Sequence, residues 1–182
     1  MRRILCGAAL CGAVLIALPC AAAIRAMTLD ELTAITHETL LVQVTGRSTF
    51  TPGVPDAESV WTRLVVEGES LRSGEAFSGS IAFLGSHDPA DHFGTSEMPT
   101  LQDTRTGTTV LLLAERLADF PGGPTLVAHN LSYVYRVEQG FGAPVVVGKG
   151  EGAAFPANVK LSEARALAHG AHLKAQSAAA GK

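Results

Sequence analysis

The chain is poor in the groups on which covalent cross-linking and thiol chemistry depend. Its 182 residues contain three cysteines, and all three lie within the N-terminal segment Met1–Ala23. If that segment is removed on export, the mature chain has no disulfide, no thiol nucleophile and no cysteine metal ligand. Small secreted domains often depend on disulfides. The mature chain from Ile24 to Lys182 must instead be held together by apolar packing, and it is long enough for one domain with an adequate core.

Runs of like charge and catalytic signatures are also missing. Removal of Met1–Ala23 takes Arg2 and Arg3 from the 14 basic residues and leaves all 17 acidic residues, and these charges are scattered singly. A mildly acidic chain without a basic run is poorly suited to nucleic acid or to an anionic membrane surface. No G-x-S-x-G, P-loop, dinucleotide fingerprint or HExxH occurs. We therefore expect no nucleic-acid partner, and a binding domain rather than an enzyme.

The N-terminal segment has the pattern of a signal peptide. An arginine pair is followed by the uncharged apolar core Ile4–Leu18 and by three alanines that end at Ala23. The apolar core is too short for a stable membrane span, which argues against an uncleaved anchor. Pro19 stands before Cys20 where a lipobox needs a small residue. We expect cleavage after Ala23, export to the periplasm or the medium, and no transmembrane segment in the mature chain.

The mature chain is rich in strand patterns. Its most apolar run, Thr108–Glu115 (TTVLLLAE), is short and follows a polar turn, which predicts a central strand buried on both faces. Val60–Leu71 alternates between apolar and polar residues, as a strand with one solvated face does. Trp61 lies on its polar face, where it either covers the end of the sheet or binds a ligand. Further strands are predicted at Thr39–Thr49, Phe77–Leu84, Thr125–His129, Leu131–Glu138 and Pro144–Val147, with a break or bend at Asn130.

A helix is predicted on each side of the strands. Thr28 and Glu31 have the spacing of a capping box and open a short helix that ends near His37. A second helix is expected to begin with Ser162 as a possible cap. The expected organisation is a lead-in at 24–27, a barrel-like domain at 28–160, a C-terminal helix at 161–175 and a flexible tail at 176–182.

The predicted fold is mainly β. Short strands separated by glycine-rich turns favour a small antiparallel OB-like barrel or sandwich, with a short N-terminal helix and a C-terminal helix. Closing the sheet into a barrel would also hide strand edges that would otherwise be exposed. Phe120–Pro124 is predicted to be a turn because it combines two prolines with two glycines.

The order of the predicted elements can be compared with that of known folds. It includes four segments, which are in turn LLVQVTG, WTRLVVEGESLRSGE, TTVLLLAE and YRVEQGFG. In this order, from about Thr28 to Phe155, the chain resembles a group of exported bacterial proteins with a small OB-like barrel, loosely similar to the inhibitory domain of tissue inhibitors of metalloproteinases. The shared features are apolar spacing and glycines, so the resemblance implies a fold. Those inhibitors act through an N-terminal cysteine. The mature chain has none, so their mechanism is not carried over.

The long polar stretch Gly85–Gly107 contains the best candidates for chemistry. His87, Asp88, Asp91 and His92 are suitable ligands for zinc or another divalent metal. Asp and Pro are also ordinary turn residues, so a plain loop is the alternative. No other cofactor is implied.

Four further histidines lie outside this stretch, and one of them, His37, is expected at the end of the first helix, where the helix dipole favours it without any function. His169 and His172, three residues apart on the last helix, are expected on a solvated face. His129 is expected to be a structural histidine with its hydrogen bonds satisfied.

These sequence features are compatible with three hypotheses for the function of the protein. The leading hypothesis is an exported, non-enzymatic domain that binds an unknown protein or surface ligand. The alternatives are a metal-binding protein or metal-dependent enzyme using His87–His92, and a structural component of the envelope.

Overall fold

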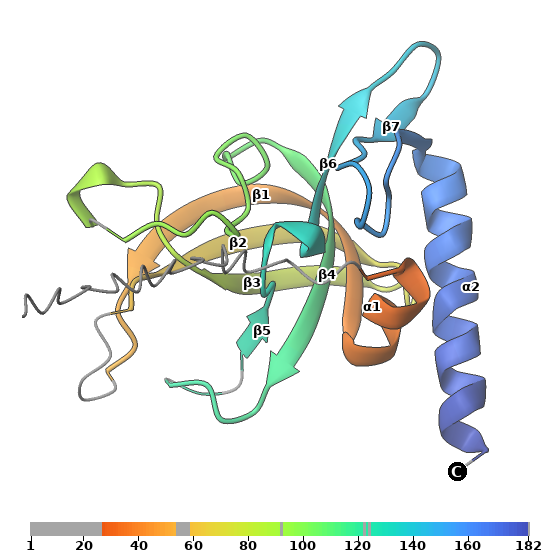
Figure 1. Cartoon of the computed structure of the whole chain (residues 1–182), viewed down its shortest axis with the longest axis horizontal. Helices are drawn as coiled ribbons and strands as arrows, with labels where there is room; N and C mark the ends of the chain where they lie inside the picture. The colour runs from red at the N-terminus through yellow and green to blue at the C-terminus, as the bar shows by residue number, and fades with distance from the viewer. Residues whose placement is uncertain (1–26, 54–58, 92, 122, 124, 182) are drawn as a thin grey trace, which may run out of the picture.

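The computed structural model describes residues 27–53, 59–91, 93–121, 123 and 125–181 (Figure 1). The predicted signal peptide, its cleavage site and all three cysteines lie outside these residues. In the described part of the chain, no helix combines the length and hydropathy needed to cross a membrane.

The first element of the described residues is helix α1 (Leu29–Ile35), which is capped as the sequence predicts. The Thr28 side-chain oxygen accepts a hydrogen bond from the Glu31 N–H at 3.3 Å. The Glu31 carboxylate accepts one from the Thr28 N–H at 2.8 Å. Both groups would otherwise be unsatisfied at the start of the helix. The buried side chain of Leu32 then attaches α1 to the core.

Eight strands form one mixed sheet with the order β1-β2-β3-β5-β4-β6-β7-β8. Because β1 also pairs with β4, the first five strands make a partial ring. All pairings are antiparallel except that of β3 with β5, which is parallel and was not predicted. The strands are β1 (Glu38–Phe50), β2 (Trp61–Ser70), β3 (Ala76–Leu84), β4 (Thr109–Leu117), β5 (Thr125–Val127), β6 (Val134–Gln139), β7 (Pro144–Val146) and β8 (Val159–Lys160).

Strand β4 lies at the centre of this arrangement. It pairs with β1, β5 and β6, and every residue from Val110 to Ala114 is fully buried. The apolar run TTVLLLAE is therefore the strand around which the sheet is built, as predicted. It needs no polar face because other elements cover both of its sides.

The alternation predicted for β2 is confirmed. Thr62, Leu64 and Val66 are fully buried, whereas Arg63 and Val65 between them are exposed. The inner face of β2 therefore contributes to the main core. That core also contains the edge-to-face pair of Tyr135 and Phe155, whose ring centroids are 5.1 Å apart.

The strand break predicted at Asn130 is also present. The Asn130 side chain accepts a hydrogen bond from the Ser132 N–H at 2.8 Å and opens the single 3₁₀ turn η2 (Leu131–Tyr133) between β5 and β6. This turn lets the chain leave the ring after β5 and pair with β4 again through β6. Figure 1 shows the hairpin of β6 and β7 projecting from the body of the molecule.

The C-terminal helix differs from the prediction at both ends. Helix α2 (Leu161–Ala180) has Lys160 as its N-cap, without a side-chain hydrogen bond, and Ser162 lies inside the helix. Lys160 is also paired with β7 through the unpredicted strand β8, so the sheet determines where the helix begins. The helix continues past residue 175 because its last turns are rich in alanine, the best helix former.

Candidate functional site

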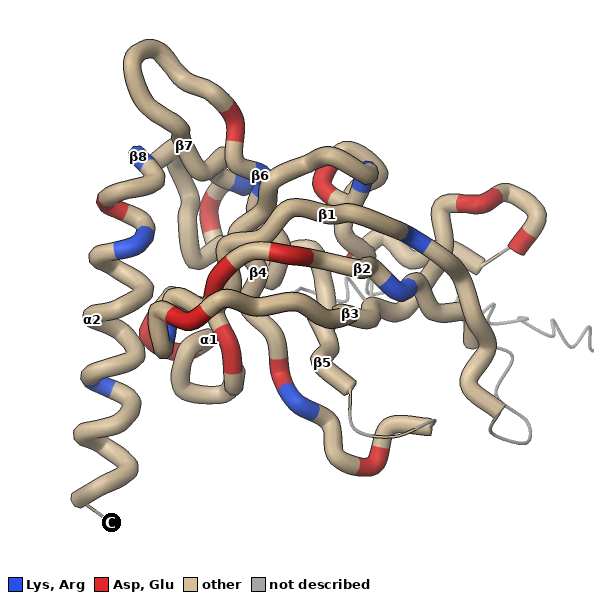
Figure 2. Tube along the Cα trace, turned by 180° about the vertical axis from the view of Figure 1, so that it is seen from behind, with Lys and Arg blue, Asp and Glu red and all other residues tan. Residues whose placement is uncertain are grey.

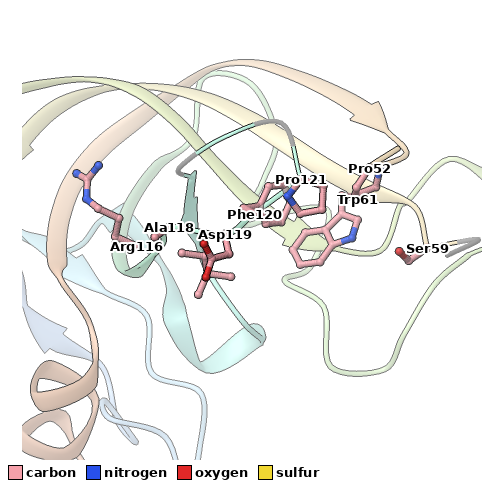
Figure 3. Close-up of a pocket in the computed structure, with 9 residues that line it drawn as sticks. Pro52, Ser59, Trp61, Arg116, Ala118, Asp119, Phe120 and Pro121 are labelled. Atoms are coloured by element: carbon pink, nitrogen blue, oxygen red, sulfur yellow. The ribbon is translucent and has the colours of Figure 1, made fainter. Parts of the chain in front are cut away.

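Two loops of the partial ring meet at one end of the molecule and enclose an open pocket of about 400 Å³ (Figure 3). The described ends of the β1–β2 connection contribute Pro52 and Ser59. The segment from β4 towards β5 contributes most of the remaining wall. The described lining residues are Pro52, Ser59, Trp61, Arg116, Leu117, Ala118, Asp119, Phe120 and Pro121.

An aromatic cluster forms the floor of the pocket. The rings of Trp61 and Phe120 meet edge to face, with centroids 4.9 Å apart and an interplanar angle of 83°. Phe50, which does not line the pocket, also meets Phe120, with ring centroids 6.1 Å apart. Phe120 is buried against Ala82 and Val127 on the outer face of the ring. Such contacts add about 0.5–1.5 kcal/mol each to the burial of the rings.

The turn after β4 places Phe120 over the sheet. The Gly123 N–H donates to the Phe120 carbonyl oxygen at 2.9 Å, and Gly123 has φ +107°. Few residues other than glycine adopt this conformation. Pro121 follows Phe120 and completes the wall of the pocket. In its described residues, the turn predicted from this sequence is confirmed.

The pocket wall is mainly apolar and the charges lie at its rim. Arg116 and Asp119 are exposed, and Figure 3 shows the Arg116 guanidinium pointing away from Trp61 and Phe120. None of the described lining residues is a histidine, and Ser59 supplies the only hydroxyl among them. The geometry therefore suits an apolar or aromatic group with a polar part at the rim.

Three of the predicted metal ligands, His87, Asp88 and Asp91, lie in the long loop between β3 and β4, and none of them lines this pocket. The His87 Nε2 atom is 2.7 Å from the Pro99 carbonyl oxygen. The Asp91 carboxylate accepts a hydrogen bond from the buried Ser86 hydroxyl. The Asp88 carboxylate accepts one from the Ala90 N–H at 2.9 Å. In this arrangement each of these side chains bonds to the loop itself.

His92, the fourth predicted ligand, lies outside the described residues. Among the residues that are described, no three His, Cys, Asp or Glu side chains gather closely enough to hold a metal ion. The metal site stays a prediction.

His129, expected to be a structural histidine, has a hydrogen-bond partner although its side chain is exposed. Its Nε2 atom is 2.8 Å from Glu115 Oε2, and its ring meets that of Tyr133 edge to face at 5.6 Å. Burial, and then the charge of Glu115, raises the pKa of the Tyr133 hydroxyl. These residues connect β4 to the segment that leaves β5.

His172 does not lie on a solvated face, so that prediction is wrong. It is 4% exposed, whereas His169 is exposed. Its Nε2 atom is 2.8 Å from the Thr39 hydroxyl of β1. Burial lowers the pKa of His172, and the nearby Arg72 guanidinium lowers it further. Packing of α2 against the ring turns this histidine inward.

Protein-family models, characterised proteins and solved structures give no match to this chain. What the structure shows is a mainly β mixed sheet with a partial ring of five strands.

The place of Trp61 on the polar face of its strand allows a ligand-binding role, but the sequence pattern does not predict the pocket. Two local signals were available: an aromatic residue after a proline-rich loop, and Phe120 before a turn. Neither signal alone shows that the two rings meet, because they are far apart in the sequence.

Proposed function

We propose that the chain is an exported, non-enzymatic binding domain with an OB-like barrel. It binds a protein ligand by taking an apolar or aromatic side chain of that ligand into the pocket of Trp61 and Phe120. The observation that carries the proposal is this apolar pocket between the β1–β2 and β4–β5 connections.

The strand pairing supports the OB-like description. The partial ring has the order β1-β2-β3-β5-β4 and returns to β1. In OB folds, a five-stranded partly open barrel, ligands bind beside the loops that join strands 1 and 2 and strands 4 and 5. The pocket lies between the equivalent two connections of this chain.

The chemistry of the pocket favours a protein over a nucleic acid. A nucleic-acid site of this fold combines stacking aromatics with a cationic groove. Here Arg116 is the only cation among the described lining residues, Asp119 stands beside it at the rim, and the mature chain is acidic overall. Apolar pockets with polar rims are typical anchoring points for a side chain of a protein partner.

The chain carries its own reporter for this site, because Trp61 is its only tryptophan. Capped tripeptides with a central phenylalanine or leucine should shift the Trp61 emission in a saturable way, and a central serine should not. Ser59→Phe, which fills the pocket, should weaken binding on the order of tenfold. Ser96→Phe, on the long loop, is the matched control. Equal responses to all three peptides would contradict the proposal.

The protein partner can then be captured at the pocket. A photo-crosslinking amino acid in place of Ala118, which is exposed at the pocket, should join the partner in the producing cell. The same group at Ser96 should not. Ser59→Phe should abolish the crosslink from position 118. A structural envelope component would show no difference between the two positions.

A metal-dependent function remains a separate prediction. Elemental analysis of the purified exported chain, followed by titration with zinc, tests it directly. Zinc bound by the wild type and lost in His87→Ala would support that function, and a metal-free chain without affinity for zinc would remove it.

A further inference from the structure

Part of β3 has no neighbouring strand on one side. The pairing of β3 with β2 runs without interruption from Ala76 to Leu84, but its pairing with β5 consists of Ile81 and Ala82. Among the described residues, no strand pairs with Ala76–Ser80 on the side away from β2. The N-terminal half of β3 is therefore an open edge of the ring.

The main-chain groups that face this edge can be identified. The Ala82 carbonyl accepts a hydrogen bond from the Ala128 N–H on the side away from β2, whereas the Glu75 carbonyl accepts one from the last residue of β2. Successive residues of a strand direct their main-chain groups to opposite sides. Ala76 and Ser78 precede Ala82 by an even number of positions, so they direct their N–H and C=O groups to the open side.

The edge lacks the features that normally prevent strand addition. Beyond Val44, β1 also pairs with β2 alone, but there the pairing carries a bulge between Val44 and Gly46 and the open edge carries Arg47. Bulges and charged residues discourage a further strand. The stretch Ala76–Ser80 contains no charge and no proline, and its register with β2 has no bulge.

The neighbouring strand gives the open edge a charge preference. Ser78 is opposite Glu67 and Ala76 is opposite Glu69, and Figure 2 shows the acidic positions of β2 beside β3. The Glu69 carboxylate binds Arg165 of α2, whereas Glu67 is exposed and has no ion-pair partner among the described residues. Because serine and alanine are small, a lysine or arginine on an added strand can extend across them towards Glu67.

We infer that this edge of β3 docks an extended segment of another protein, with basic residues at alternate positions. The segment adds a strand to the ring through the main-chain groups of Ala76 and Ser78, and its basic side chains face Glu67. A second copy of the chain is a poorer occupant because it would bring its own acidic row. The edge lies at the other end of β3 from Leu84, which pairs with Trp61 of the pocket, so this site is independent of the proposed function.

The test uses the purified exported chain and a short capped peptide of alternating lysine and valine. Nuclear magnetic resonance should show shifted amide signals at Ala76 and Ser78 and slower hydrogen exchange there. Ser78→Pro removes the outward N–H and is tolerated at an open edge. It should weaken binding on the order of tenfold, whereas Ser78→Thr, which keeps that N–H, should bind as the wild type does.

A second variant keeps the test decisive if Ser78→Pro does not fold. Glu67→Lys leaves the main chain of β3 unchanged and should weaken the same peptide by a similar factor, with recovery for a peptide of alternating glutamate and valine. Peptide-induced shifts confined to residues outside β2 and β3, or undiminished binding by both Ser78→Pro and Glu67→Lys, would overturn the inference. The inference would also be overturned if two copies of the chain paired through β3 in the absence of peptide and this dimer prevented the peptide from binding.

Discussion

At the scale of single residues, Gly68 shows how closely two strands of the ring approach. A Cβ added to Gly68 would lie 2.2 Å from the Leu41 carbonyl oxygen and 2.7 Å from Val42 Cα of β1. Neither atom belongs to a side chain that could turn aside. The absence of a side chain at this position therefore allows β1 and β2 to keep their register there.

Gly68→Ala should consequently destabilise the fold by roughly 1–3 kcal/mol, the usual cost of overpacking. Gly170→Ala is the matched control. Its added Cβ meets no atom within 4 Å, and alanine in a helix interior should stabilise α2 by roughly 0.5–1 kcal/mol. Urea unfolding followed by Trp61 emission measures both changes. A Gly68→Ala midpoint equal to that of the wild type would show that the strands separate without cost.

Lys149 and Asp103 form a second constraint at this scale. Their charged atoms are 2.9 Å apart, and the side chains are 13% and 8% exposed. The Lys149 ammonium also donates to the Leu131 carbonyl oxygen at 2.8 Å. The pair thus attaches the long loop before β4 to the chain around β6 and β7.

Lys149→Met should lower the free energy of unfolding by about 3–5 kcal/mol, because it leaves the Asp103 carboxylate buried without its partner. The double variant Lys149→Met/Asp103→Asn should recover part of the lost free energy of unfolding, because the asparagine carries no buried charge. Arg165→Met, which breaks the exposed pair with Glu69, should cost less than about 1 kcal/mol. Equal losses in Lys149→Met and Arg165→Met, measured by urea unfolding, would contradict this account of burial.

At the scale of elements, the docking of α2 depends on one buried imidazole. Three alanines of α2 (Ala164, Ala168 and Ala171) pack closely on the body of the protein, and His172 follows them at the Thr39 hydroxyl. The charged or titratable groups that act on His172 are Arg72, Glu38 and His169, of which only Glu38 favours its protonated form. Its neutral form is therefore the one that fits this interface.

The pH dependence follows from the lowered pKa of His172. As the pH falls, the His172 imidazole of the unfolded protein takes up a proton near pH 6.5, whereas that of the folded protein does so only at a lower pH. The contribution of neutral His172 to the free energy of unfolding is therefore complete above about pH 6.5. It decreases as the pH falls below this value, and it is lost once the pH is below the pKa of His172 in the folded protein. His172→Gln should reduce the fall of the thermal midpoint between pH 7.5 and pH 5.5, whereas His169→Gln should not. Identical slopes in the two variants would show that His172 does not control this fall.

At the scale of the whole molecule, export and composition make one joint prediction. The exported protein should have the mass of residues 24–182 and should carry no group that reacts with a maleimide, because all three cysteines precede the expected cleavage site. Its unfolding curve should be the same with and without reductant. Labelling by maleimide, or a lipid on Cys20, would show that the N-terminus is processed differently.

Much of the fold was predictable because it depends on local patterns. The capping box of Thr28 and Glu31, the alternation along β2 and the unbroken apolar run of β4 each have a physical cause within a few residues. The end of α2 was predicted less well. Its alanines extend the helix to Ala180, although a short polar tail was expected there.

The sequence by itself therefore determined the positions of both helices and of most strands, the buried face of β2, and that no cysteine follows residue 20. Only the tertiary structure decided that Trp61 meets Phe120, that His172 faces inward, and that half of β3 has no strand on its side away from β2 among the described residues. Side-chain periodicity is a local property of a strand or helix. Which segments meet depends on the pairing of distant strands and the packing of α2, and these are set by the burial of the whole chain at once.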